Sequence, residues 1–297
     1  MKNWQLKKGD RIGIVSTARS IEFSEIVLAD QLLKEWGFIP LYGKTIGMKQ
    51  NQFAGTDDER AADLQAMLDD KSIRAILFAR GGYGTIRMID KLDFTKFMEH
   101  PKWLSGYSDI TVLHAHVNDK LGLPTIHSTM PYSFPRNTEG AIQSLKNILL
   151  GNFPTYQVEP HALNIPGEAE GELIGGNLSI LYSLLGTKFG FNTAGKILFL
   201  EDIDEYLYHI DRMMMSLQLA GKFAGLKGIM FGGFTDMKDN KVPFGSSAEE
   251  IIYDHVQNLG IPVCFLFPCG HIDDNRALLL GKRVKLTVGE NVTLNYL

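Results

Sequence analysis

The chain has 297 residues, which is too long for one small core and suits two domains of ordinary size. It is 44% hydrophobic and 22% charged, a balance that indicates a globular protein and excludes a disordered or fibrous one. The formal net charge of -4 leaves no basic field that would gather nucleic acid or anionic lipid.

The cysteines and the apolar runs narrow the class further. Cys264 and Cys269 make neither a disulfide framework nor a four-ligand zinc site. No run approaches the roughly 20 apolar residues of a membrane span, and no charged-then-apolar leader precedes the first predicted strand. We therefore expect a cytoplasmic enzyme or binding protein that needs no metal or other cofactor and has no nucleic-acid or membrane partner.

The first half of the chain alternates short apolar runs with helical patterns. Strands are predicted at 11–16, 39–42, 74–79, 102–106 and 124–128. Helices are predicted at about 24–36, from a capping box formed by Thr56 and Glu59, and at about 109–120. Strands that alternate with helices predict a mostly parallel sheet covered on both faces.

The pattern lapses over 151–171, where three prolines and no sustained period predict a linker. This linker would join an N-terminal domain, 1–150, to a C-terminal domain, 172–297. The second half resumes the alternation, with strands at 196–201, 228–234 and 262–267, helices near 206–220 and 248–260, and a terminal hairpin over 283–297.

Two stretches of the first half lie where open α/β sheets place functional groups, beyond the ends of strands. The glycines of "ARGGYGT" (79–85) allow the close backbone approach of an anion nest or oxyanion hole, although a tight turn without a ligand explains them equally well. In "GYSDI" (106–110), Ser108 matches the nucleophile elbow G-x-S-x-G except that Ile110 replaces the last glycine. Ser108 is either a nucleophile or the N-cap of the following helix.

A carboxylate and a histidine follow strands of the second half. Glu201 either orients an imidazole or begins an acidic, solvated loop, "EDIDE", that includes Asp202. His271, on the Gly/Pro loop "FPCGHIDDNR", is suited to general-base work, whereas other histidines, such as His127 at a strand end, offer less. The order serine, carboxylate, histidine is that of α/β-hydrolases, so one hypothesis is a triad that joins the two domains.

The chain resembles the LD-carboxypeptidase family of serine peptidases, which also contains the microcin-immunity peptidases. The resemblance covers nearly the whole chain and rests on a series of motifs in order: "GDRIGIVSTA", "FAGTDDERAADLQAMLDDKSIRAILFARGGYG", "LSGYSDITVLH", "GELIGGNLSIL", "LFLEDIDE", "HIDRMMMSL" and "FPCGHIDDNRALLLGKRVKL". It implies a three-layer α/β N-terminal domain with a mostly parallel sheet and the nucleophile elbow, joined to a smaller C-terminal α/β domain. It also implies an active site between the domains and a homodimer.

The same resemblance assigns roles to residues. It makes Ser108 the nucleophile, Glu201 the orienting carboxylate and His271 the general base, with an oxyanion hole formed by the backbone N–H groups of Gly82 and Asp109. The implied reaction, which needs no metal, cleaves the amide between an L-diamino acid and D-alanine in cytoplasmic murein tetrapeptides during peptidoglycan recycling.

Several points stay open at this stage. The diamino acid is lysine or diaminopimelate, and the candidates for binding the terminal carboxylate are Arg80, Arg87 and Arg276. One alternative function is that of a microcin-immunity-like peptidase acting on acyl-nucleotide peptides. The other is a non-catalytic α/β protein whose glycine loop binds an anion.

Overall fold

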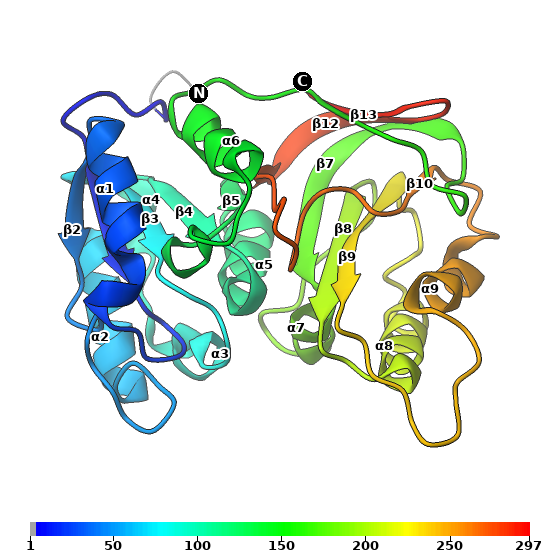
Figure 1. Cartoon of the computed structure of the whole chain (residues 1–297), viewed down its shortest axis with the longest axis horizontal. Coiled ribbons are helices and arrows are strands. Elements are labelled where there is room, and N and C mark those ends of the chain that lie inside the picture. The colour runs from blue at the N-terminus through cyan, green and yellow to red at the C-terminus, as the bar shows by residue number, and fades with distance from the viewer. Residues whose placement is uncertain (1–3) are drawn as a thin grey trace.

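The computed structural model describes residues 4–297, which form two α/β halves side by side along the longest axis of the molecule (Figure 1). The first sheet has the strand order β11-β5-β4-β3-β1-β2, and all of its neighbours pair in parallel except β11 with β5. Its strands are β1 (Arg11–Val15), β2 (Ile39–Tyr42), β3 (Ile73–Phe78), β4 (Trp103–Gly106), β5 (Thr125–His127) and β11 (Leu278–Leu280). The predicted α/β class and the mostly parallel sheet are confirmed.

Helices cover both faces of this sheet, which gives the first half three layers. One hydrophobic cluster joins the sheet to α1 (Val27–Glu35) and α6 (Glu139–Leu149), and another joins it to α2 (Asp57–Asp69) and α5 (Thr111–Lys120). The predicted capping box starts α2, because the Thr56 hydroxyl accepts from the backbone N–H of Glu59 and the Glu59 carboxylate accepts from that of Thr56. The shorter helices are η1 (Phe23–Ile26), α3 (Thr85–Met88), η2 (Ile89–Lys91), α4 (Thr95–Glu99), η3 (Ser108–Ile110) and η4 (Pro131–Ser133).

The second sheet has the order β10-β9-β8-β7-β12-β13-β6. Its strands are β6 (Tyr156–Val158), β7 (Gly167–Asn177), β8 (Ile197–Ile203), β9 (Gly228–Thr235), β10 (Val263–Cys264), β12 (Lys282–Val288) and β13 (Val292–Tyr296). Strands β7 to β10 pair in parallel, and β12 and β13 form the predicted antiparallel hairpin. The helices of this half are α7 (Leu178–Ser183), α8 (Leu207–Leu219) and α9 (Ala248–Val256).

The segment 151–171 is more than a linker. It contains β6, which pairs with β13 at the sheet edge, and the beginning of β7, which pairs with β12. In "GEAEGEL" (167–173) the residues Ala169, Gly171 and Leu173 are buried and the glutamates between them are less buried, which is the period-two pattern of a strand. This pattern is hard to recognise in the sequence, because two of its three buried residues, Ala169 and Gly171, are small. The boundaries at 150 and 172 stay a prediction.

The strand predicted at 262–267 is also shorter than expected. Of the predicted residues, only Val263 and Cys264, which form β10, pair with β9 as a strand. Leu266 has a φ of 55°, in the left-handed region, which ends the extended backbone, and the backbone N–H of Phe265 donates to the side chain of Asn164 instead of to a strand. The segment that leads to His271 is therefore irregular, although Phe267 donates to the carbonyl of Phe231 in β9 and Cys269 accepts from the N–H of Gly233 in the same strand.

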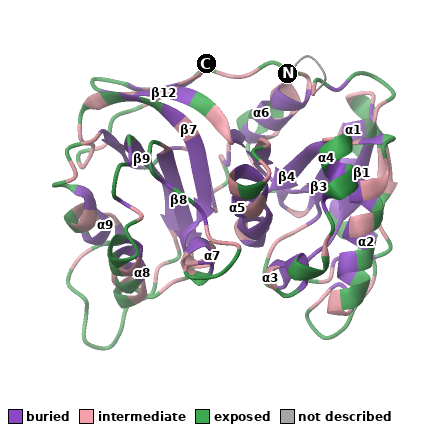
Figure 2. Cartoon of the chain, turned by 180° about the vertical axis from the view of Figure 1, so that it is seen from behind, coloured by how far each residue is buried: buried purple, intermediate pink, exposed green. Residues whose placement is uncertain are grey.

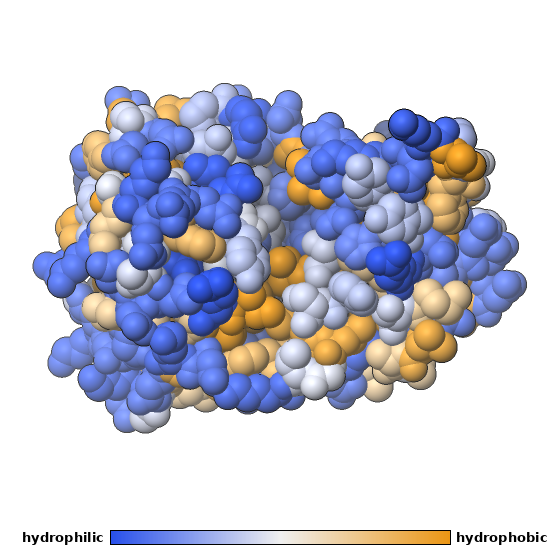
Figure 3. Space-filling model, turned by 90° about the horizontal axis from the view of Figure 1, so that it is seen from below, coloured by the Kyte–Doolittle hydropathy of each residue, from blue (hydrophilic) through white to orange (hydrophobic). Residues whose placement is uncertain are grey.

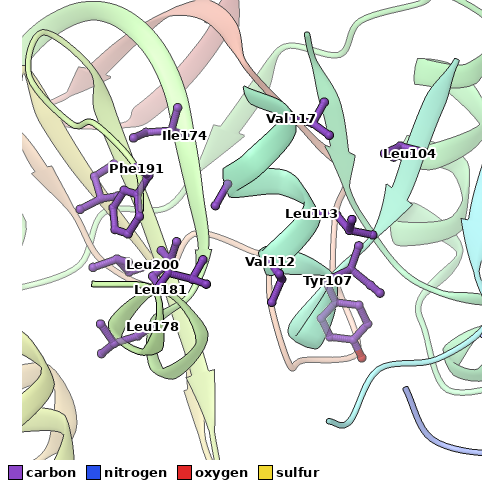
Figure 4. Packing of buried hydrophobic residues seen from close by; sticks show 14 of the residues in the cluster. Leu104, Tyr107, Val112, Leu113, Val117, Ile174, Leu178, Leu181, Phe191 and Leu200 are labelled. Carbon is purple, nitrogen blue, oxygen red and sulfur yellow. The ribbon is translucent and has the colours of Figure 1, made fainter. Parts of the chain in front are cut away.

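One hydrophobic cluster runs through both halves. Helix α5 lies between the two sheets, with Val112, Leu113 and Val117 in the same cluster as Ile174 and Leu200 of the second sheet (Figure 4). The central strands β3, β4, β8 and β9 are almost entirely buried, whereas α1, α2, α8 and α9 expose their outer faces (Figure 2). Seen from below, hydrophobic residues reach the surface near the middle of the molecule, between two hydrophilic ends (Figure 3). Because the halves share a core, residues from both can be held at fixed positions in one site.

Candidate active site

Ser108 lies at the turn between β4 and α5. Its φ of 63° is in the left-handed region, a conformation that costs a residue with a side chain about 1–2 kcal/mol. A methyl group on Gly106 would lie 3.0 Å from the Ile110 side chain, so the turn needs glycine there, and Ile110 itself is buried in the core. Ser108 is not an N-cap, because Tyr107 occupies that position without a side-chain hydrogen bond. The strand, sharp turn and helix are the geometry of a nucleophile elbow.

The glycine loop 79–85 packs directly against this serine. A methyl group on Gly81 would lie 2.9 Å from Cβ and 3.0 Å from Oγ of Ser108, so no larger residue fits. Gly82 and Gly84 have φ values of 122° and 147°, which only glycine adopts readily. The loop can therefore bring its backbone close to a group bound at the Ser108 hydroxyl.

Asp109 ties the elbow to the glycine loop. Its carboxylate is fully buried and accepts a hydrogen bond of 2.8 Å from the backbone N–H of Thr85, at the end of the loop. Burial raises the pKa of Asp109 to about 6, although hydrogen bonds from the loop and the charge of Arg60 oppose that rise. The buried Arg60 donates to the carbonyl groups of Gly84 and Thr17, which fixes the loop from its other side.

Glu201 and His271 form a close pair. Glu201 is fully buried, and its Oε2 accepts from the ring Nδ1 of His271 at 2.6 Å and from the His271 backbone N–H at 3.1 Å. A methyl group on Gly270 would lie 2.7 Å from the Glu201 side chain, so glycine lets the loop approach the carboxylate.

The pair shifts the pKa of both residues. Burial raises the pKa of Glu201, but the charge of His271, the nearby His127 and the hydrogen bond of His271 outweigh burial and lower the pKa to about 2. Burial lowers the pKa of His271, but the charge and the hydrogen bond of Glu201 raise it above its ordinary value. Glu201 is thus ionised at neutral pH, and its partner ring is more basic than a free imidazole.

Ser108 and His271 line the same pocket, which has a volume of about 460 Å³. Gly81 and Gly82 line it as well, so the predicted serine, histidine and glycine loop come together although they are far apart in the sequence. Within residues 4–297 no hydrogen bond joins the Ser108 hydroxyl to the His271 ring. Such contacts are often long in the absence of a substrate.

Asp202 differs from the sequence expectation. It is buried rather than part of a solvated loop, and its two oxygens accept from the Asn177 amide and from the backbone N–H of Ser179, each at 2.8 Å. Burial and the neighbouring charge of Glu201 raise the pKa of Asp202 to about 7, although these donors oppose the rise. Neighbours on a strand point to opposite sides, so only Glu201 meets the histidine. Asp204, two residues on, is exposed as expected.

Three arginines of the first half, Arg19, Arg80 and Arg136, line the pocket. Arg80 and Arg136 lie over the ring of Tyr132, at 4.3 and 5.4 Å from its centre. None of the three forms an ion pair with a carboxylate in the part of the chain that the structure describes.

Of the three arginines named from the sequence, two pair with carboxylates and one lines the pocket. Arg87 pairs with Asp57 and Arg276 pairs with Asp274, so Arg80 alone of those candidates lies in the pocket. Sequence reasoning missed Arg19 and Arg136, which follow β1 and η4 without any motif of their own.

The described residues form neither a metal site nor a membrane-spanning helix. No group of three or more histidines, cysteines, aspartates or glutamates there is arranged to hold a metal ion. The helices of that part of the chain are all too short or too polar to cross a membrane.

Comparison with known proteins places the chain. Residues 12–128 match the family model of the LD-carboxypeptidase N-terminal domain, and residues 170–286 match that of the LD-carboxypeptidase C-terminal domain. A probable murein peptide carboxypeptidase of Bacillus subtilis is 34% identical, over 97% of this chain and 92% of that protein. The murein tetrapeptide carboxypeptidase of Pseudomonas aeruginosa is 31% identical, over 96% of this chain and 95% of that protein.

Solved structures agree with these relatives. The crystal structure of a muramoyltetrapeptide carboxypeptidase from Oxalobacter formigenes superposes with a TM-score of 0.87 and 26% identity, covering 96% of this chain and 98% of that one. A microcin C7 self-immunity protein shares the fold, with a TM-score of 0.86 and 23% identity over 98% of this chain and 97% of the other. The chain belongs to the LD-carboxypeptidase family.

Proposed function

We propose that the protein is a serine-type LD-carboxypeptidase that removes D-alanine from murein tetrapeptides. One observation carries this proposal: Ser108, strained on an elbow beneath a glycine loop, shares a pocket with a histidine whose Nδ1 is held by a buried carboxylate. The relatives in Bacillus subtilis and Pseudomonas aeruginosa, which are named as murein peptide carboxypeptidases, support the substrate class.

The chemistry follows the positions of these groups. Since Nδ1 of His271 faces Glu201, its Nε2 is free to take the Ser108 proton as Oγ attacks the carbonyl carbon of the diamino acid. The C–N bond then breaks, and His271 returns the proton to the departing amine of D-alanine. Water, deprotonated by the same histidine, hydrolyses the acyl-enzyme and regenerates Ser108.

The oxyanion of each tetrahedral intermediate would lie between the Ser108 elbow and the glycine loop. We assign its donors to the backbone N–H groups of Asp109 and Gly82, since the first follows the nucleophile and the second belongs to the loop packed against it. Losing one such donor typically lowers the turnover rate by about 10²–10³-fold.

The unpaired arginines suit an exopeptidase, which must hold a terminal carboxylate. A guanidinium binds a carboxylate with two parallel hydrogen bonds, and Arg19, Arg80 and Arg136 have no carboxylate partner within residues 4–297. We propose that they bind the carboxylates of the tetrapeptide, that the enzyme acts in the cytoplasm as a homodimer, and that EDTA leaves its activity unchanged.

The test is release of D-alanine, measured by mass spectrometry, from murein tripeptide–D-alanine with lysine or diaminopimelate at the third position. The proposal expects release by the wild type and none by Ser108→Ala. Cleavage of an acyl-sulfamoyl nucleotide without cleavage of either tetrapeptide would replace it with the microcin-immunity activity. Absence of hydrolysis with all three substrates would favour the binding protein.

A further inference from the structure

Glu201 faces a second histidine, His127, at the end of β5. Its ring Nε2 lies 3.9 Å from Oε1 of Glu201, and both side chains have no exposed surface. Each of these two atoms is buried and has no hydrogen-bond partner among the described residues. The other carboxylate oxygen, Oε2, already accepts two bonds from His271. The unpaired donor or acceptor of His127 and the unpaired oxygen of Glu201 therefore point to each other.

Electrostatics decides which tautomer His127 adopts. A lone pair on Nε2 would repel the ionised Glu201, whereas an Nε2–H group attracts it, and burial strengthens both effects. With hydrogen on Nε2, the other nitrogen Nδ1 is an acceptor, and the thiol of Cys269 lies 3.2 Å from it. Burial raises the pKa of Cys269 well above its ordinary value, so this thiol keeps its one hydrogen and can donate it either to Nδ1 of His127 or to the Arg276 carbonyl, which lies 3.1 Å away.

The ring of His127 cannot easily turn away from this position. It packs edge-on against Phe199, with ring centres 5.0 Å apart, and against Tyr107, at 5.9 Å. The distance of 3.9 Å exceeds an ordinary N–H···O bond by about 1 Å, which a small rotation of the glutamate side chain can close.

We propose that His127 is a positioning residue of the reaction, which donates its Nε2–H to Oε1 of Glu201. The bond holds the carboxylate so that Oε2 faces His271, and it draws off part of the negative charge that makes His271 basic. The hydrogen-bonded chain then runs from His127 through Glu201 to His271, which shares the pocket with Ser108. This proposal rests on the proposed function for its kinetic consequences but not for its structural ones.

Removing the donor has a direction that can be stated in advance. His127→Leu leaves Oε1 without a partner, so the negative charge of Glu201 acts more fully on His271 and the pKa of His271 rises. A general base must be neutral, so the acid limb of kcat/KM moves to higher pH. The other titratable or charged groups that face this chain are Tyr107, His114, Asp202, Cys269 and Arg136.

The first experiment needs no substrate. NMR of the wild-type protein labelled with ¹⁵N-histidine is expected to show His127 with hydrogen on Nε2, and His127→Leu is expected to raise the pKa read from the His271 ring. Hydrogen on Nδ1 of His127 instead, or an unchanged His271 pKa in the variant, would overturn the proposal. These results hold or fail independently of which peptide the enzyme cleaves, and the tautomer is read without any variant.

The kinetic arm uses D-alanine release. His127→Leu is expected to lower kcat by about 10–100-fold, the range found when a hydrogen-bond partner that orients a metal-ligating side chain is removed, with little change in KM. His127→Gln, whose amide can donate to Oε1, is expected to restore kcat to within a few-fold of the wild type. His116→Leu, on α5 and outside the pocket, is the matched control and should leave the pH profile unchanged. Equal losses in the leucine and glutamine variants would contradict the role of the donor.

Discussion

The backbone of Ser108 lies in the left-handed region, with a φ of 63°. Asp204 and Asp236, which also line the pocket, have φ values of 65° and 54°. Residues with side chains adopt this region only where the surrounding structure holds them, and such positions gather at functional sites. The strain is therefore concentrated around the pocket, where the fold presents side chains at the ends of strands β4, β8 and β9.

Ser108→Ala is expected to abolish hydrolysis, by at least about 10³-fold, because the nucleophile is removed while the oxyanion hole remains. Its stability should change little, since the hydroxyl is partly exposed and makes no hydrogen bond within residues 4–297. The measurements are kcat and thermal unfolding, with Ser183→Ala on the exposed side of α7 as the control. A residual turnover of more than a few per cent would assign the nucleophile elsewhere.

Glu201→Gln is expected to lower turnover by about 10⁴-fold, the effect of the corresponding change in a serine protease triad, because the amide favours the wrong tautomer of His271. Asp202→Asn is the neighbouring control and should act mainly on stability. The NH₂ group of the new asparagine would face an N–H donor of Asn177 or Ser179, so one buried hydrogen bond is lost. This loss lowers the free energy of unfolding by about 1–3 kcal/mol. An inactive Asp202→Asn beside an active Glu201→Gln would move the orienting role to Asp202.

The lowered pKa of Glu201 also predicts how stability depends on pH. The pKa falls from 4.5 in the unfolded chain to about 2, so ionised Glu201 stabilises the folded state fully above pH 4.5 and less as the pH falls toward 2. The difference in unfolding free energy between the wild type and Glu201→Gln should shrink over that window, while the contributions of other carboxyl groups cancel. Denaturant unfolding at several pH values measures it, and a constant difference would refute the ionised pair.

Among the elements, the glycine loop and the elbow depend on each other. Gly82→Ala would strain a φ of 122° and place a methyl group 2.6 Å from the Arg19 side chain, so the loop must shift. We expect kcat to fall by about 10²-fold, as for a lost oxyanion donor, with a smaller change in KM. Gly122→Ala has a φ of 64° and no neighbour within 4 Å, so it reports the backbone cost alone and should retain full activity. If the two variants were equally active, the glycine loop would not contribute a donor to the oxyanion hole.

Elements with a clear period could be predicted from the sequence, because burial on one face imposes that period. The buried stripe of α8 and the hairpin of β12 and β13 are examples. The early end of β10 at Cys264 could not be predicted, because an apolar run does not reveal that Leu266, two residues on, has a left-handed backbone. The pairing of β11 with β5 joins residues far apart in the chain, and no local pattern indicates it.

The site shows the same division. Ser108 and His271 could be singled out as candidates because each lies in a distinctive motif after a strand, and the structure places both in one pocket. Three other residues could not be singled out in this way, because what matters is which groups the fold brings near them. His127 lies beside the buried carboxylate of Glu201, and Arg19 and Arg136 line the pocket. Asp202 was expected in a solvated loop because acidic runs are usually solvated. Only the structure shows that it is buried and accepts a hydrogen bond from the Asn177 amide.

At the scale of the whole molecule, the two halves supply different parts of the site. The first half contributes Ser108, the glycine loop and the pocket arginines, and the second contributes Glu201 and His271. The shared core around α5 holds them together, which a flexible link between separate domains would not do.

The arginines give a prediction at this scale. Arg80→Gln and Arg136→Gln are each expected to raise KM for the tetrapeptide by about 10-fold or more, because a charged hydrogen bond to the terminal carboxylate is lost. The same variants should change KM much less for a substrate ending in D-alaninamide, which has no such carboxylate. Arg87→Gln, whose side chain pairs with Asp57 outside the pocket, is the control. Equal losses on both substrates would mean that the arginines act on structure.

The central claim is that Ser108 is a nucleophile activated by His271. It is tested most directly by treating the protein with a fluorophosphonate and locating the label by mass spectrometry of its peptides. We expect one label, on Ser108, which is lost in Ser108→Ala and forms far more slowly in His271→Ala. A protein that stays unlabelled, or a label on another residue at the same rate in both variants, would contradict it.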